Sequence, residues 1–382
     1  MTRRTMEIES LAAFDDHLAV TARLNGWFVQ SVDLTERAAE LERVVVRGAV
    51  FLGCRFGPGV EERLRRRGAL IFPALPELPF DPYRPRLYAA DDLYCDPADG
   101  RLLPYLSSPD AAIYAWAKEA QVHRSLDHSL ATSLHDHAMS DALDEALHSA
   151  AYQGGRPVVG IMGGHALART DDAYWQAARL ATDLTAAGRV VLTGGGPGAM
   201  EAANLGAYLS PEPESLVEAR ALLGKVTDYR ASIDDWVETG YQVRELLPAG
   251  RAGHSLGIPT WFYGHEPTNV FATEVAKYFA NALREDTLLH RCRGGIVYLP
   301  GRAGTVQEIF QAVTENYYAT DDSEIAPMIL VGTDYWTRAL PAWPLLSALA
   351  SDRAMEPVIA CVDSVAEALD RLEAFATDTP IP

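Results

Sequence analysis

From residue 157 onward, short apolar segments alternate regularly with longer amphipathic segments. The apolar segments are predicted strands at Val158–Met162, Val190–Thr193, Ile258–Tyr263, Gly295–Leu299, Pro327–Val331 and Pro357–Val362. The amphipathic segments are predicted helices at Asp171–Ala187, Gly198–Tyr208, Asn269–Leu283, Thr305–Tyr317, Tyr335–Leu349 and Val365–Ala376, and the fifth is expected to be broken by Pro341 and Pro344. Buried strands that alternate with helices form a parallel sheet covered on both faces. The sequence therefore predicts an α/β fold with a doubly wound, Rossmann-like parallel sheet, interrupted by Ser210–Gly257.

The run Gln153-Gly154-Gly155-Arg156-Pro157 is the clearest break in the chain. It divides the sequence into an N-terminal α/β extension, residues 1–152, and a nucleotide-binding domain, residues 153–382. The extension shows no long repeat, and its role is not indicated. Within it we expect buried strands in Val44–Gly53 and Ala69–Ala74, a helix at Val60–Arg67, and helical structure from Ser108 to about Tyr152.

Charge and composition restrict the class of partner. The 382 residues carry a formal net charge of -19, which opposes binding to a nucleic-acid polymer because the phosphate backbone repels an acidic surface. No apolar run is long enough to span a bilayer, and no secretory signal is visible. The four cysteines are scattered without metal-binding spacing, which is typical of reduced thiols in a cytoplasmic protein. A small anion remains compatible, because helix N-termini supply a local positive field.

Three predicted strands end in loops that contain glycine and lead into helices. Ligands of doubly wound sheets bind beyond the carboxyl ends of the strands, and glycine lets the backbone approach an anion closely. The alternative is that the glycines serve tight turns alone. The candidate phosphate-binding residues are Gly194, Gly195, Gly196, Gly198, Gly301, Arg302, Gly304 and Thr305, with Gly163, Gly164 and His165 as further candidate contacts.

The segments TGGGPGAMEAAN (Thr193–Asn204) and PGRAGTVQE (Pro300–Glu308) are similar to the signatures of the LOG family. Its members are often labelled lysine decarboxylases, but they include cytokinin-activating phosphoribohydrolases and nucleotide 5′-monophosphate nucleosidases. The resemblance covers roughly Pro157 to Ala376. It implies hydrolysis of the N-glycosidic bond of an AMP-like, purine-type nucleoside 5′-monophosphate to free base and ribose 5-phosphate. It also implies no metal or organic cofactor, and a homodimer or larger assembly.

The resemblance assigns roles to individual residues. Glu308 would act as the catalytic carboxylate near the ribose, and the amides of Gly301, Gly304 and Thr305 would hold the phosphate. The family's upstream arginine column falls on Glu285, with Arg284 one position earlier, so Arg284 is assigned to catalysis by a shift of one residue. Arg302 stands where the family has glycine, and it would either add a phosphate contact or crowd the pocket.

Three side-chain patterns have structural alternatives. Thr305-Val306-Gln307-Glu308 also fits a capping box, in which Glu308 would only accept a backbone N–H. His265 and Glu266 would either contact substrate or shape a turn, with the turn favoured. The histidines of the long helical stretch are expected on a solvated or subunit-contacting face rather than in a metal site, and they are His123, His128, His135, His137 and His148.

Other functions are weighed against nucleotide hydrolysis. A pyridoxal-phosphate decarboxylase needs a Schiff-base lysine, but Lys118, Lys225 and Lys277 do not follow strand ends beside the glycine loops. A dinucleotide dehydrogenase is disfavoured because G-x-G-x-x-G does not follow the first strand. The remaining alternative is a regulatory protein that binds a nucleotide on the same loops without cleaving it.

Overall fold

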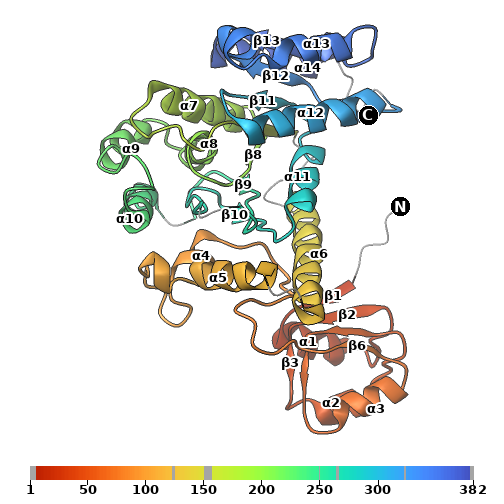
Figure 1. The fold of residues 1–382 in the computed structure, drawn as a ribbon. Coiled ribbons are helices and arrows are strands. Elements are labelled where there is room, and N and C mark those ends of the chain that lie inside the picture. Colours follow the sequence, from red (N-terminus) through yellow and green to blue (C-terminus); the bar gives the residue numbers. More distant parts are fainter. Residues whose placement is uncertain are drawn as a thin grey trace. The chain divides into compact units, whose positions relative to one another are not determined.

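The computed structural model describes residues 6–122, 125–149, 157–248, 250–263, 266–321 and 324–378. The chain forms two compact units (Figure 1). One consists of Met1–Leu87 with Trp116–Leu143, and the other of Tyr88–Ala115 with Asp144–Pro382. The predicted boundary run lies outside the described residues except for Pro157. The structure groups Tyr88–Ala115 with the C-terminal unit, although the sequence analysis places it in the extension.

The C-terminal unit is built on a seven-stranded sheet with the order β10-β9-β8-β7-β11-β12-β13, in which every neighbouring pair is parallel. The chain begins the sheet at the central strand β7 and adds β8, β9 and β10 toward one edge. It then adds β11, β12 and β13 on the other side of β7, so the strand order reverses between β7 and β11. This arrangement confirms the predicted doubly wound α/β fold. Its strands are β7 (Val158–Met162), β8 (Val190–Thr193), β9 (Ser255–Gly257), β10 (Glu274–Val275), β11 (Ile296–Tyr298), β12 (Met328–Val331) and β13 (Ile359–Val362).

Helices cover both faces of this sheet (Figure 1). α7 packs against α8 and α14, whereas α12 packs against α11 and α13. Connections between parallel strands are right-handed, so helices that follow strands added in opposite directions lie on opposite faces of the sheet. Within the described residues, no helix is both long and apolar enough to cross a membrane. The helices are α7 (Asp172–Ala186), α8 (Ala199–Tyr208), α9 (Ser215–Leu223), α10 (Ile233–Arg244), α11 (Asn281–His290), α12 (Ala303–Tyr318), α13 (Ala342–Ala350) and α14 (Val365–Asp378).

Two predicted elements of this unit are wrong. The segment Asn269–Leu283 is not one helix: it contains β10, and α11 begins only at Asn281. Residues 274–279 are buried or half-buried throughout, and they lack the solvent-facing stripe that a surface helix requires. The strand predicted at Ile258–Tyr263 lies earlier, at Ser255–Gly257. It ends before Pro259, which has no N–H for the sheet.

The N-terminal unit contains a second parallel sheet with the order β1-β2-β4-β6. Phe28 pairs with Val50 and Val50 pairs with Leu70, so each turn of chain spans about twenty residues. Each of the last three strands follows a glycine with positive φ, at Gly26, Gly48 and Gly68. The sequence analysis found no long repeat, and these turns share a strand spacing and a glycine position rather than identical residues. The strands are β1 (Met6–Ile8), β2 (Trp27–Gln30), β4 (Val50–Leu52) and β6 (Leu70–Phe72), and β3 (Asp33–Leu34) pairs with β5 (Arg55–Phe56).

Connecting helices complete this unit. Val29, Phe51 and Ile71 point to the same side of the sheet and are buried in its core. The predicted helix at Val60–Arg67 is confirmed as α3. The helices are α1 (Leu11–Val20), α2 (Ala38–Arg43) and α3 (Val60–Arg66), and later in the sequence follow α4 (Ala90–Tyr94), α5 (Pro109–Val122) and α6 (Leu126–His148).

The histidines of α6 have different environments. His135 is fully buried against Phe80 and lies 3.4 Å from Asp136 Oδ1. Burial lowers the pKa of His135. The solvated face predicted for this residue is therefore wrong, whereas His137 and His148 are exposed. His123 lies outside the described residues.

Candidate functional site

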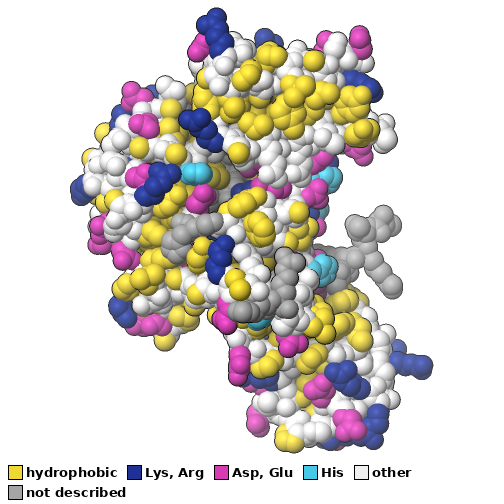
Figure 2. All heavy atoms as spheres, viewed as in Figure 1, with side chains coloured by type: hydrophobic (Ala, Val, Ile, Leu, Met, Phe, Trp, Pro, Cys, Tyr) yellow, Lys and Arg dark blue, Asp and Glu magenta, His cyan; other side chains and the backbone are white. Residues whose placement is uncertain are grey.

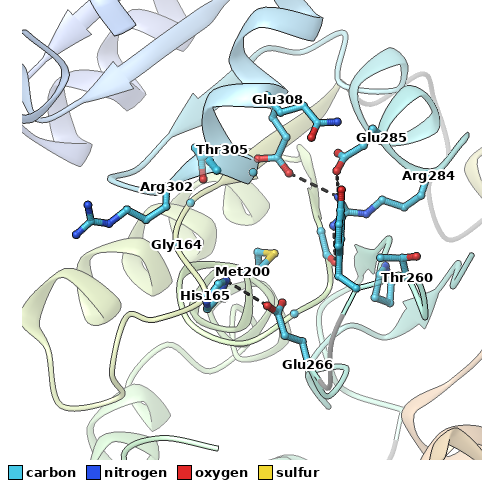
Figure 3. A pocket seen from close by; sticks show the side chains of 18 of the residues that line it. Gly164, His165, Met200, Thr260, Glu266, Arg284, Glu285, Arg302, Thr305 and Glu308 are labelled. Carbon is cyan, nitrogen blue, oxygen red and sulfur yellow. Dashed lines mark hydrogen bonds and ion pairs between the residues drawn. The ribbon is translucent and has the colours of Figure 1, made fainter. Parts of the chain in front are cut away.

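A cavity of about 470 Å³ opens in the C-terminal unit where the loops after β7, β8 and β11 meet the N-terminal turns of α11 and α12 (Figure 3). It brings together the predicted loops with Arg284 and Glu308. The sequence analysis did not single out Met200, Pro259, Thr260, Tyr263 or Gln307, which also line the cavity. The contacts of Pro259, Thr260 and Tyr263 with the glycine loops join distant segments and leave no pattern in the sequence. The remaining lining residues are Gly163, Gly164, His165, Ala166, Gly194, Gly196, Glu266, Glu285, Arg302, Ala303, Gly304 and Thr305.

The N-terminus of α12 forms one wall of the cavity. A Cβ on Gly301 would lie 2.0 Å from Thr305 Oγ1, so a side chain at this position would clash with the buried threonine. The Tyr335 hydroxyl donates to the Gly301 carbonyl oxygen and supports the loop from behind. The first-turn N–H groups of this sixteen-residue helix have no partners within the helix, and N–H groups in that position can bind an anion.

The capping role considered for Glu308 is not observed. α12 begins at Ala303, two residues earlier than predicted, and its N-cap residue is Arg302 rather than Thr305. Glu308 consequently lies in the second turn, beyond the unpaired first-turn N–H groups. Its carboxylate faces Arg284 instead.

The glycine loop after β8 forms the opposite wall. Gly195 and Gly198 both have φ of 72°, and a Cβ on Gly198 would lie 2.5 Å from the Gly164 carbonyl oxygen. Thr193 Oγ1 accepts from the Gly195 N–H at 3.0 Å and donates to Asn204 Oδ1 at 2.7 Å. Local backbone geometry by itself accounts for these two glycines, so they do not distinguish a ligand site from a tight turn.

Arg284 is held rigidly at the centre of the site. Its Nε donates to the Ile258 carbonyl oxygen at 2.7 Å, and Nη2 donates to the Gly194 carbonyl oxygen at 3.3 Å. Its Nη1 lies 2.7 Å from Glu285 Oε1 and 3.7 Å from Glu308 Oε1. One guanidinium is therefore shared by two carboxylates, both of which line the cavity.

Burial dominates the electrostatics of Glu308. The residue is 7% exposed, and desolvation raises its pKa to about 8, although Arg284 opposes the shift and Glu285 adds to it. Glu285 is also buried, and its Oε2 has no hydrogen-bond partner among the described residues. Burial thus raises the pKa of Glu308 from its ordinary value into the range of an effective acid–base catalyst.

His165 and Glu266 form an ion pair at the side of the cavity away from Glu308 (Figure 3), with 3.3 Å between His165 Nδ1 and Glu266 Oε1. Both side chains are partly exposed. Gly163 permits this loop to pass α8, because a Cβ there would lie 2.8 Å from the Ala199 Cβ. Glu266 thus lines the cavity rather than only shaping a turn, whereas His265 lies outside the described residues.

Lys277 is placed differently from the sequence-based expectation. It lies in extended chain after β10, not within a helix. It is buried, and Nζ donates to Asp110 Oδ1 at 2.6 Å and to Thr268 Oγ1 at 2.9 Å. Neither Lys277 nor the other two lysines, Lys118 and Lys225, line the cavity, so none is positioned there for Schiff-base chemistry.

A buried ion pair fixes α8, the helix that follows the glycine loop. Arg169 and Glu201 are each 1% exposed, and Arg169 Nη2 lies 2.5 Å from Glu201 Oε1. The same guanidinium donates to Thr239 Oγ1 at 2.8 Å and to the Trp236 carbonyl oxygen at 3.1 Å on α10. This cluster joins the loop before α7, the start of α8 and the interrupting segment.

Replacing Gly304 with alanine tests whether a ligand approaches the α12 N-terminus. A Cβ on Gly304 would meet nothing within 4 Å, and alanine is favoured over glycine in helices by up to about 1 kcal/mol. We therefore expect unchanged or slightly raised thermal stability, together with at least a tenfold loss of affinity for inorganic phosphate, measured by calorimetry. Unchanged phosphate affinity would mean that no anion binds close to these amides.

No family model matches the chain, and no curated protein matches it. Among solved structures, the chain is similar to the molybdenum cofactor binding protein from the phototrophic bacterium Rippkaea orientalis, with 18% identity, a TM-score of 0.36, and coverage of 58% of this chain and 98% of that chain. It is also similar to a Moco carrier protein from Chlamydomonas reinhardtii, with 16% identity, a TM-score of 0.34, and coverage of 59% and 99%. Likenesses with TM-scores below 0.5 carry no conclusion about function.

Proposed function

We propose that this protein hydrolyses the N-glycosidic bond of a nucleoside 5′-monophosphate in the cavity between the glycine loops. The observation that carries the proposal is the combination of an unpaired helix N-terminus with a buried carboxyl of raised pKa one turn further along the same helix. The first feature binds a phosphate, and the second suits proton transfer near the sugar attached to it.

The proposed substrate would lie in the cavity with its phosphate at α12 and its base at α11. The 5′-phosphate would lie on the N–H groups of Gly304 and Thr305, and the Thr305 hydroxyl could donate to it. Because α12 rises by 1.5 Å per residue, Glu308 lies on the order of 5 Å deeper than Thr305, within reach of the ribose. The base would then extend toward α11 and Tyr263, which also line the cavity.

The reaction requires a water oxygen to bond to C1′ while the C1′–N bond breaks and its electron pair goes to the base. The leaving base takes up a proton. The sugar passes through a cation-like state, which the ionised Glu308 carboxylate stabilises while it accepts the proton of the attacking water. Arg284 keeps this carboxylate in place and favours its ionised form.

The activity should therefore rise with pH. Only ionised Glu308 can accept a proton, and its pKa of about 8 leaves a minority of molecules active at pH 7. We expect kcat/KM for AMP to rise about tenfold per pH unit well below pH 8 and to level off above it. The measurement is kcat/KM between pH 5.5 and 9.5. A profile that falls across this range would assign Glu308 as a proton donor instead.

The proposal is tested by incubating the full chain with AMP, GMP, CMP and UMP and separating the products by chromatography. Equal amounts of free base and ribose 5-phosphate from at least one nucleotide would support it and rank the substrates. Thermal stabilisation by a nucleotide without release of base would instead identify a regulatory nucleotide-binding protein.

A further inference from the structure

Arg302 is a charged cavity-lining residue that the proposed reaction does not use. Its side chain is exposed and extends away from Glu308, toward the side of the cavity opposite Arg284 (Figure 3). Among the residues that the structure describes, its guanidinium has no hydrogen-bond or ion-pair partner. By contrast, Arg284 and the cavity's histidine, His165, both contact carboxylates.

The position of Arg302 relates it to the phosphate site. It is the N-cap residue of α12, directly before the turn whose N–H groups would hold the 5′-phosphate. Arg302, Ala303 and Gly304 are all exposed, and Gly304 has open space around its Cα. The cavity is thus open on the side beyond the proposed first phosphate, and the guanidinium of Arg302 lies on that side.

We propose that Arg302 binds a second phosphate group, so that the site prefers nucleoside 5′-diphosphates to monophosphates. This inference rests on the proposed function, because it takes the first phosphate to lie on the α12 N-terminus. A guanidinium binds phosphate oxygens through two parallel N–H donors. The β-phosphate of a diphosphate projects away from the ribose and Glu308, which is the direction that the Arg302 side chain takes.

The bond that is cleaved stays the same. Water adds to C1′, the C1′–N bond breaks with its electron pair going to the base, and the base takes up a proton. The products from ADP would be adenine and ribose 5-diphosphate. Arg302 acts here as a specificity-determining residue, distant from the bond that breaks.

The test compares Arg302→Gln with Arg179→Gln, measuring by calorimetry the dissociation constants of AMP, ADP, inorganic phosphate and pyrophosphate at low salt. Arg179 is exposed on α7 and does not line the cavity, so its substitution makes the same change in net charge. We expect the unsubstituted protein and Arg179→Gln to bind ADP and pyrophosphate about tenfold more tightly than AMP and phosphate. Arg302→Gln should lose most of this preference, and the preference should shrink as salt is added.

The outcomes separate this inference from the proposed function. ADP binding no tighter than AMP binding in the unsubstituted protein, or a preference that survives Arg302→Gln, would overturn it even if AMP is hydrolysed. A preference that depends on Arg302, found in a protein that releases no base, would support the second phosphate site and contradict the hydrolysis. Inorganic phosphate and pyrophosphate keep the comparison valid in either case, because they contain no glycosidic bond.

Discussion

Glu308→Gln is expected to lower kcat for base release from AMP by about a thousandfold, within the range that general acid–base catalysis contributes. Glutamine has nearly the same shape as glutamate but can neither carry the negative charge that stabilises the cation-like sugar nor accept a proton from water. Nucleotide affinity should change little, because the phosphate contacts lie one turn away. The measurement is single-turnover base release beside calorimetric binding.

A matched control is available on the same helix. Glu315 is half-buried on α12 and pairs with His290, and it does not line the cavity. Glu315→Gln should therefore leave base release within about twofold of the unsubstituted protein. Normal turnover by Glu308→Gln would refute its catalytic role.

Glu308→Gln has a second expected effect, on the stability of the protein. The folded pKa of Glu308, about 8, is raised above the ordinary value of 4.5, so the folded state holds a proton that the unfolded state has lost. Stability therefore falls as the pH rises from about 4.5 to about 8. Glu308→Gln removes this loss and should stabilise the protein at pH 9, by on the order of a few kcal/mol, but much less at pH 5. Destabilisation at both pH values would indicate a structural role.

Arg169→Met is expected to destabilise the protein by about 3–5 kcal/mol, because it leaves Glu201 buried without its charged partner. The guanidinium also lies over the Trp236 ring, with 4.8 Å from Cζ to the ring centre, so the loss includes packing. Urea unfolding followed by circular dichroism measures the change in midpoint.

The double variant Arg169→Met/Glu201→Gln provides the control for this prediction. Removing both charges eliminates the unpaired buried carboxylate, and the double variant should recover much of the lost stability. If Arg169→Met lowers the free energy of unfolding by less than about 1 kcal/mol, the ion pair is not needed to hold α8.

The loops of the site were predictable because their sequence patterns are local. A buried strand, a glycine cluster and a following helix lie within about ten residues, and their geometry follows from the sheet's topology. The loop before Glu308 was therefore placed at the cavity from the local pattern, whereas Glu308 itself was assigned to the site by the family resemblance, because its spacing from Thr305 also fits a capping box. The start of α12 was missed by two residues, because Thr305 resembles an N-cap residue whereas the helix begins at Ala303.

The contacts that shape the site were not predictable, because they join distant parts of the chain. Arg169 and Glu201 carry no pattern that marks them as partners, and the sharing of Arg284 between Glu285 and Glu308 depends on the packing of α11 against α12. The segment before α11 was misassigned for a related reason. Its largely apolar run, which includes the buried Lys277, fits a buried extended chain as well as a buried helix, and only tertiary packing decides between them.

Base release from AMP at pH 8 in a buffer without inorganic phosphate tests the central claim most directly. The account predicts free adenine and ribose 5-phosphate in equal amounts, formed by the unsubstituted protein and by Glu315→Gln but not by Glu308→Gln. No adenine from the unsubstituted protein, under conditions where calorimetry shows the cavity to be saturated with AMP, would contradict the account and leave a protein that binds the nucleotide without cleaving it.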